Sequence, residues 1–443
     1  MRKTIVKIVA VRENPDVPCW PCINHDADKE LKRVVTPIKE MNPDMDFDVV
    51  SYTELAQAHA DYQEDLKKYD GVLVLLMTCW KFIDVFYSHQ AAEGLPTIIA
   101  DVPFCGSGSA LVFSANVIRN EKLPVPLLST LDYGEIAKAV RLFDVLHKMK
   151  ETNILVVSEM DLADGEKSFH ETWGCNFINK TAAQLNEYLD KVNLEEARLV
   201  AQRWVEETTE TAEPSMDEII ESASLHLAIK AMMADTHADA VTIDCLSLSY
   251  GGKYEGGKHM YPCLSHYEML NNGIVAVCEA DLCATVTSLV IQYLTGRPGF
   301  VSDPVIDTSS EQIIYAHCVA CSKVYGKNDP RRCRCYIRSH SEDKKGASVQ
   351  VCFPAGEKLT TAMIYPKEQA PTVIHSSESV GNVGLQEACR SKLAAKAEAE
   401  NILYNWNAGW HRVTVFSDCR KQLMNLFKMK GLTVTQEDKC PAD

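Results

Sequence analysis

The sequence of 443 residues lacks any run of about 18 consecutive apolar residues, the length that a membrane-spanning helix needs. Its formal net charge of −16 leaves no excess of positive charge for general binding to nucleic acid or to an anionic membrane. The start, MRKTIVKIVAV, is too short and too interrupted by Lys7 for a secretion signal. These absences predict a cytoplasmic protein with neither a nucleic-acid nor a membrane partner.

Common catalytic signatures are also missing. The sequence contains no GxSxG nucleophile motif and no HExxH zinc motif. The segment Gly106-Ser-Gly-Ser follows a predicted strand, but it matches neither the dinucleotide GxGxxG pattern nor the Walker motif with its lysine. The sequence therefore gives no support for the common hydrolases, and a flexible loop is the better interpretation of this glycine-rich segment.

Cysteine, in contrast, is abundant, with 17 residues. In a chain without a secretion signal, reduced cytoplasmic thiols are the better interpretation. Cys19-Trp-Pro-Cys22 lies between a predicted strand and a predicted helix, as in a thioredoxin-type redox motif. The parallel strand and helix pattern that follows does not supply the rest of that fold, which disfavours a redox role.

A second group of cysteines has part of the spacing of a zinc knuckle. Cys318-x2-Cys321 is followed by Cys333-x-Cys335, whose intervening segment is one residue long. Unliganded thiols are the favoured interpretation, and a structural metal held by these four cysteines stays an alternative.

Strand and helix patterns alternate over residues 1–150, which predicts an N-terminal doubly wound α/β domain with a parallel sheet. The run GVLVLLM at 71–77 is typical of a strand buried on both faces. Further strands are predicted at 5–11, 47–51, 96–100 and 124–129, and helices at 26–41, 52–68, 82–92 and 133–149.

The rest of the chain predicts two more domains. Residues 151–307 continue the α/β pattern and form a central, doubly wound domain that carries Glu279 and Asp303. From 308 to 443 short strands dominate, which predicts a β-rich antiparallel sheet or barrel that carries His411. Its strands are predicted at 313–319, 336–339, 348–353, 359–364 and 413–416, and its helices at 387–406 and 420–430.

The most informative stretch runs from Gly273 to Asp307. An apolar strand at 273–278 ends at Glu279, a helix follows, and a second acidic loop brings Asp303. Ligands bind outside the carboxyl ends of strands in open α/β folds, so Glu279 is well placed for chemistry. Paired carboxylates can share a divalent metal or act as acid and base, although each acid alone would be an ordinary solvated loop residue.

Two histidines are further candidates. His411 lies between a predicted helix and a predicted strand in the aromatic segment NWNAGWHRV, where a neutral imidazole could bind a metal. His317 lies within the strand predicted at 313–319. For both residues a packed or hydrogen-bonded core histidine is the alternative.

Together these segments resemble the L-fucose isomerase and L-arabinose isomerase superfamily. The resemblance rests on three places. The first is IDC at 243–245, PCLS at 262–265 and GIVAVCEADL with the downstream LTGRPGF and SDP; the second is the HC pair at His317 with IRSH and PAGEKLTTAMI; the third is WNAGWHRVTVFSD. A weaker match is MTCWKF at 77–82. The likeness spans about residues 70 to 430 in order and spacing.

The resemblance implies a set of site residues. Glu279 and Asp303 correspond to the two carboxylates that bind the metal and flank the sugar, and His411 corresponds to the third metal ligand. It also implies Mn²⁺, with Mg²⁺ or Co²⁺ as alternatives, and a homotrimer or homohexamer with sites between subunits. The implied substrate-binding residues are Trp80, which a neighbouring subunit contributes, Asn407 and His317.

The leading hypothesis is therefore a metal-dependent aldose–ketose isomerase. It would act through a cis-enediol on a free pentose, a hexose or a modified (deoxy, acidic or sulfonated) sugar. The first alternative is a non-catalytic sugar-binding protein with the same fold. The second is an interaction protein stabilised by zinc at the cysteines of the third domain.

Overall fold

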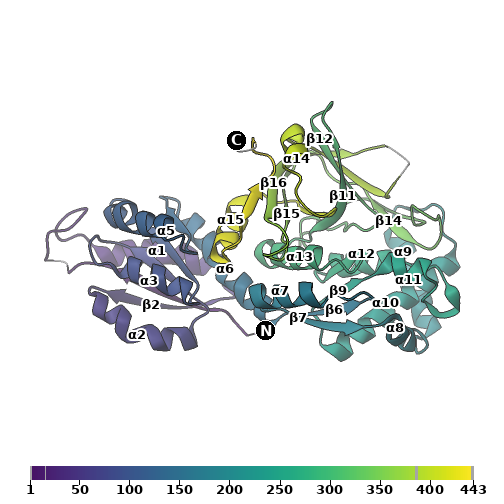
Figure 1. Cartoon of the computed structure of the whole chain (residues 1–443), viewed down its shortest axis with the longest axis horizontal. Helices are drawn as coiled ribbons and strands as arrows, with labels where there is room; N and C mark the ends of the chain where they lie inside the picture. The colour runs from purple at the N-terminus through teal and green to yellow at the C-terminus, as the bar shows by residue number, and fades with distance from the viewer. Residues whose placement is uncertain (1, 15, 385–387, 441–443) are drawn as a thin grey trace. The chain divides into compact units, whose positions relative to one another are not determined.

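A computed structural model describes residues 2–14, 16–384 and 388–440, and the chain divides into two compact units (Figure 1). The first unit comprises Met1–Lys148 and Lys421–Thr433, and the second comprises Met149–Arg420 and Val434–Asp443. Across the described ranges, no helix is both long and apolar enough to cross a bilayer.

The first unit is built on a five-stranded parallel sheet with the order β2-β1-β3-β4-β5. This is a common order of doubly wound sheets. All six residues of β3 are buried, as expected for a strand covered on both faces. The parallel α/β architecture predicted for this segment is confirmed. Its strands are β1 (Ile5–Val11), β2 (Asp46–Tyr52), β3 (Gly71–Leu76), β4 (Thr97–Asp101) and β5 (Leu127–Ser129).

Helices cover both faces of this sheet. One face packs on α2 (Leu55–Lys68), α3 (Ile83–Ala92) and the continuous α4 (Ser107–Ser109), η1 (Ala110–Ser114) and α5 (Ala115–Asn120). On the other face, α1 (Ala27–Met41) and α6 (Tyr133–Glu151) lie side by side, since the Asn42 amide donates to the carbonyl of Ala137. The last helix, α15 (Arg420–Met429), belongs to this unit from Lys421 on, and Lys421 pairs with Glu135 at 3.1 Å.

The second unit begins with a four-stranded parallel sheet with the order β10-β9-β6-β7. Its strands are β6 (Asn153–Val157), β7 (Asn176–Lys180), β9 (Ala240–Ile243) and β10 (Val275–Cys278). The helices of this part are α7 (Ala163–Trp173), α8 (Ala182–Leu189), α9 (Leu194–Glu207), α10 (Met216–Thr236), α11 (Cys245–Tyr250), the short η2 (Glu255–Gly257), α12 (Cys263–Asn271) and α13 (Leu282–Thr295).

The same unit continues into an antiparallel barrel of six strands. The strand order is β15-β18-β11-β12-β17-β16, and pairing between β15 and β16 closes the barrel. The β-rich architecture predicted for the C-terminal region is confirmed. The barrel strands are β11 (Phe300–Asp307), β12 (Gln312–His317), β15 (Lys358–Met363), β16 (Thr372–Asn382), β17 (Ser391–Lys396) and β18 (Arg412–Val415).

The second unit contains several smaller elements besides the barrel strands. β19 (Val434–Gln436) adds in parallel to β16, and α14 (Ala399–Asn405) precedes β18. A separate three-stranded sheet joins β8 (Glu210–Thr211), β13 (Cys335–Arg338) and β14 (Ser348–Val351).

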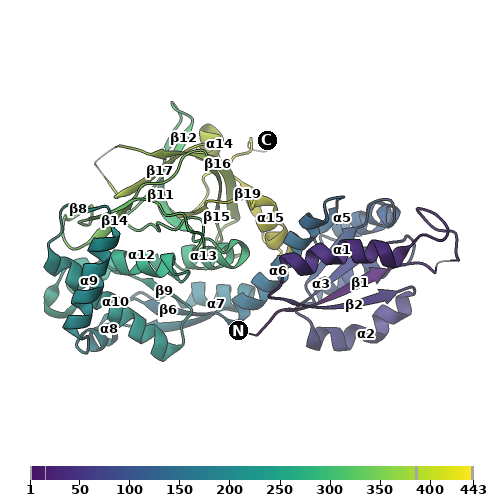
Figure 2. The same cartoon turned by 180° about the vertical axis from the view of Figure 1, so that it is seen from behind.

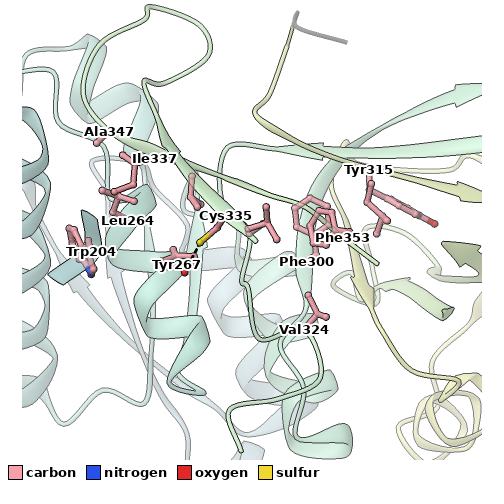
Figure 3. Close-up of a cluster of buried hydrophobic side chains, with 14 of the residues drawn as sticks. Trp204, Leu264, Tyr267, Phe300, Tyr315, Val324, Cys335, Ile337, Ala347 and Phe353 are labelled. Atoms are coloured by element: carbon pink, nitrogen blue, oxygen red, sulfur yellow. Dashed lines mark hydrogen bonds between the residues drawn. The ribbon is translucent and has the colours of Figure 1, made fainter. Parts of the chain in front are cut away.

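A layer of helices lies between the parallel sheet and the barrel. Figures 1 and 2 show α12 and α13 in this layer, and α13 contacts β9 and β10 as well as β11, β15 and β18. One hydrophobic core runs from the helices into the barrel and includes Trp204, Leu264, Phe300 and Tyr315 (Figure 3). The carboxyl edge of the parallel sheet is thereby held against barrel strands, which is the setting of the candidate site.

Two local predictions were wrong. The helix predicted over 387–406 is a strand, β17, followed by the short helix α14; residue 387 itself lies outside the described residues. The alanines of SKLAAK favour helix, but pairing with β12 and β16 on both sides outweighs this preference. Asp303, predicted on a loop, lies within β11.

Candidate metal centre

Glu279 is presented by a sharp turn at the carboxyl end of β10. Glu279 and Ala280 both adopt left-handed backbone conformations, with φ of 65° and 51°. Non-glycine residues seldom do so, and such strain is typical of functional sites. The turn ends at Asp281, whose side chain accepts a hydrogen bond from the backbone N–H of Ala284 at 2.8 Å and thereby caps α13.

The pairing register of the barrel strands β11 and β18 brings Asp303 and His411 together. Ser302 on β11 pairs with Arg412 on β18, so Asp303 lies opposite His411, which directly precedes β18. The Nε2 atom of His411 is 3.2 Å from Oδ1 of Asp303 and 3.7 Å from Oε2 of Glu279. Three separate segments therefore bring two carboxylates and one imidazole together.

The environment of His411 suits a metal ligand. Its Nδ1 atom lies 2.7 Å from Oδ2 of Asp281, which fixes the ring and leaves Nε2 facing Glu279 and Asp303. Nε2 is buried and has no partner with hydrogen-bond geometry among the described residues. A carboxylate that holds the far nitrogen of a histidine ligand is the usual outer-shell arrangement of metal sites. The residues present therefore fit a divalent cation.

The charges of the site favour the same cation. Burial lowers the pKa of His411, but the carboxylates of Asp281, Asp303 and Glu279 outweigh burial and raise this pKa to about 10. A divalent ion would satisfy the same negative potential, and it binds the neutral imidazole. Metal binding at this site must therefore displace a proton from His411 near neutral pH.

His317 also reaches this cluster. Its Nε2 atom is 3.7 Å from Oε1 of Glu279, and one potential ligand atom each from Glu279, His317 and His411 lie within 4.8 Å of one another. However, the Nδ1 atom of His317 accepts a hydrogen bond from the backbone N–H of Val319 at 3.2 Å. In the neutral ring the proton is then on Nε2, so His317 is better suited to donate to Glu279 or to a ligand than to bind a metal.

Two other residues were named from the sequence as substrate-binding. Trp80 follows β3 in the first unit, is 67% exposed and contacts the ring of Phe113 edge-on. Asn407 is exposed in the segment between α14 and β18, four residues before His411. Within the second unit, the sequence-named residues Glu279, Asp303, His411 and His317 form one cluster.

Sequence reasoning missed two residues of the site region. Asp281 could have been found, because an aspartate directly before an apolar helix is a typical N-cap. Lys392, which is 6% exposed, pairs with Ala316, which pairs in turn with Asp303, so the three share one face of the barrel wall. No sequence signal could have shown this, because the lysine lies in the strand that was predicted as a helix.

A cavity of about 390 Å³ adjoins the turn after Glu279. It lies between the start of α7, the start of α13 and the segment after β15. Its lining includes Asp161, Asp164, Phe169, Asp281 and Gln369. The lining combines these carboxylates with apolar side chains such as Leu162 and Leu282.

The cysteines with partial zinc-knuckle spacing have separate partners. The thiol of Cys318 contacts the hydroxyl of Ser341 at 3.1 Å, that of Cys321 donates to the Asn271 side chain at 3.2 Å, and that of Cys335 contacts the Tyr267 hydroxyl at 3.1 Å. This arrangement supports the interpretation as unliganded thiols.

Comparisons with known proteins add little. No family model and no curated protein matches the sequence. A solved structure of a two-component system response regulator/GGDEF domain protein is similar over 65% of this chain and 97% of that chain, at 11% identity and a TM-score of 0.26. A TM-score this low carries no information about fold or function.

Proposed function

We propose that the protein is a metal-dependent aldose–ketose isomerase acting on a free pentose, a hexose or a modified sugar. The observation that carries this proposal is the meeting of Glu279, Asp303 and His411, with Nε2 of His411 buried and turned toward both carboxylates. These are the three residues at which the sequence resembles the metal ligands of the L-fucose and L-arabinose isomerases. Family membership rests on that resemblance.

The ligand set indicates the kind of ion. Two carboxylates and one imidazole, with positions left for sugar oxygens and water, suit octahedral Mn²⁺, and Mg²⁺ or Co²⁺ could replace it. When bound, the ion supplies positive charge beside the two sugar oxygens where negative charge develops. Asp281 orients His411 for this role.

The protein's own groups move the protons. Glu279, whose side chain is 35% exposed, is assigned to take the proton from the carbon next to the carbonyl and to return it to the neighbouring carbon. Asp303 flanks the sugar on the barrel side. The Nε2–H group of His317 is assigned to stabilise the Glu279 carboxylate or to bind a sugar hydroxyl.

The proposed function includes an oligomeric state. We propose a homotrimer or homohexamer in which Trp80 of one subunit completes the sugar pocket of the next. An exposed tryptophan supported by Phe113 is well suited to stacking on a sugar ring.

The test follows solvent deuterium into C1 or C2 across a panel of aldoses and ketoses, with chelator-treated protein to which Mn²⁺ is returned. Glu279→Gln should reduce exchange about 10²- to 10⁴-fold while the fold survives. Glu400→Gln, on exposed α14 of the same unit, is the matched control and should not change exchange. Retained exchange in Glu279→Gln would refute the assignment, and binding of metal and sugar without exchange in the parent protein would identify a sugar-binding protein.

A further inference from the structure

A second group of metal-binding side chains lies in the first unit, apart from the residues assigned to catalysis. Cys79 follows β3, Cys105 follows β4, and the connection from β1 to α1 carries Cys19, Cys22 and His25. β1, β3 and β4 are adjacent parallel strands, so these segments leave the sheet at one edge. This edge is where ligands bind in such folds.

The closest pair has the spacing of two ligands on one metal. Nε2 of His25 is 3.6 Å from Sγ of Cys105. A tetrahedral zinc ion with Zn–S of about 2.3 Å and Zn–N of about 2.0–2.1 Å separates sulfur and nitrogen by about 3.6 Å. Cys105 is 3% exposed and His25 is half-buried, so the pair forms the inner wall of the cluster.

We propose that Cys19, Cys22, His25 and Cys105 form a structural zinc site. The spacing Cys-x2-Cys-x2-His places three donors on one short connection after β1, and Cys105 supplies the fourth from the segment after β4, two strands along in the sheet. Three thiolates and one imidazole are a common donor set of closed, tetrahedral zinc sites. The site would tie the connection between β1 and α1 to the end of β4.

The two remaining thiols lie on the same short connection as His25, and in the structure they are not yet gathered around the His25–Cys105 pair. Sγ of Cys19 donates to the carbonyl of Cys22 at 3.6 Å, which already folds the Cys-x2-Cys turn back on itself. Cys22 is exposed and Cys19 is half-buried. Zinc would turn the Cys19 thiol from this contact, and the Cys22 thiol from its exposed position, toward His25 and Cys105.

The surroundings favour a cation over a redox role. Burial raises the pKa of the Cys105 thiol to about 11, and the carboxylates of Glu30 and Asp101 act in the same direction. Burial and the carboxylate of Glu13 also raise the pKa of Cys19. Reactive redox thiols need a lowered pKa, whereas a zinc ion can displace the protons from all three thiols.

The experiment uses the full chain, purified under reducing conditions and loaded with either zinc or cobalt. Bound zinc is measured by elemental analysis after gel filtration, and the cobalt form is examined for thiolate-to-metal charge-transfer absorption. The metal centre at Glu279 has no thiolate donor, so this absorption reports on cysteine ligands, and its loss in Cys22→Ser assigns it to the proposed site. The variant is Cys22→Ser, which changes an exposed side chain, and Cys440→Ser is the control at an exposed thiol of the second unit.

The parent protein and Cys440→Ser should show the thiolate absorption, and Cys22→Ser should lose most of it. Zinc affinity at this site should fall at least about tenfold in Cys22→Ser, and chelation should lower the melting temperature of the parent more than that of the variant. Absence of thiolate absorption in the parent, or equal zinc affinity in parent and Cys22→Ser, would overturn the proposal. A Cys19–Cys22 disulfide that forms in place of zinc binding would also overturn it.

Discussion

At the scale of single residues, Asp281 has two roles that substitutions can separate. Its side chain caps α13 and also holds Nδ1 of His411. Asp281→Asn keeps a capping oxygen but loses the charge, so metal affinity should fall about 10- to 100-fold, and the metal-free variant should lose only the stability that comes from pairing with the protonated His411 ring. Asp281→Ala should lose the same affinity and about 1 kcal/mol of unfolding free energy as well. Calorimetric titration with Mn²⁺ and denaturant unfolding measure the two effects, and equal stability of both variants would contradict the capping role.

The raised pKa of His411 predicts how metal binding depends on pH. The pKa of His411 is raised from its ordinary value of 6.5 to about 10, so the imidazole is protonated at neutral pH. The metal, in contrast, binds the neutral imidazole. Apparent affinity should therefore rise about tenfold for each pH unit between about 7 and 9. In the metal-free protein, the stability contributed by this ion cluster is full below about pH 6.5 and is lost as the pH rises toward 10.

Titrations with Mn²⁺ under argon at three pH values measure this slope. In Asp281→Asn the Mn²⁺ affinity should depend less steeply on pH, because the variant removes one of the carboxylates that stabilise the charged ring. A pH-independent affinity in the parent protein would show that His411 does not exchange its proton for the metal.

At the scale of elements, the turn after β10 stores backbone strain. Ala280 lies in the left-handed region with φ of 51°, which glycine adopts without penalty. Ala280→Gly should therefore raise the unfolding free energy by up to about 1 kcal/mol. It should also lower activity, because a freer turn positions Glu279 less well.

Ala276→Gly, at a buried position within β10, is the matched control and should destabilise by about 1 kcal/mol. Denaturant unfolding compares the two variants. If both destabilise equally, the strain at Ala280 has no energetic consequence.

Some of these elements could be predicted from the sequence and others could not. Apolar runs such as that of β3, and a strand followed by Glu279, were predictable because local patterns specify them. The strand β17 was not predictable, because its residues favour helix and it is a strand only through pairing with β12 and β16. The contact of Asp303 with His411 depends on the register of two strands that are more than 100 residues apart in the sequence. Local propensity could not predict this contact, and only the family resemblance suggested that the two residues share a site.

At the scale of the whole molecule, the proposed shared site predicts complementation between inactive subunits. Trp80→Ala should impair turnover about 10-fold or more if stacking on the sugar matters, and Glu279→Gln should abolish it. Mixed oligomers formed by unfolding and refolding the two variants together should regain activity, because some sites combine an intact Trp80 with an intact Glu279. Turnover of the mixture is compared with that of each variant refolded alone. No recovery in oligomers shown to be mixed would mean that each site lies within one chain.

The return of α15 to the first unit bears on how the protein is made. Leu423, Leu426 and Phe427 of this helix are buried, although more than 270 residues of the other unit are synthesised between Lys148 and Lys421. The ribosome therefore synthesises Met1–Lys148 well before it reaches the helix that completes the packing of the same unit. The first unit therefore cannot complete its packing from its amino-terminal segment alone and must wait until α15 has been made.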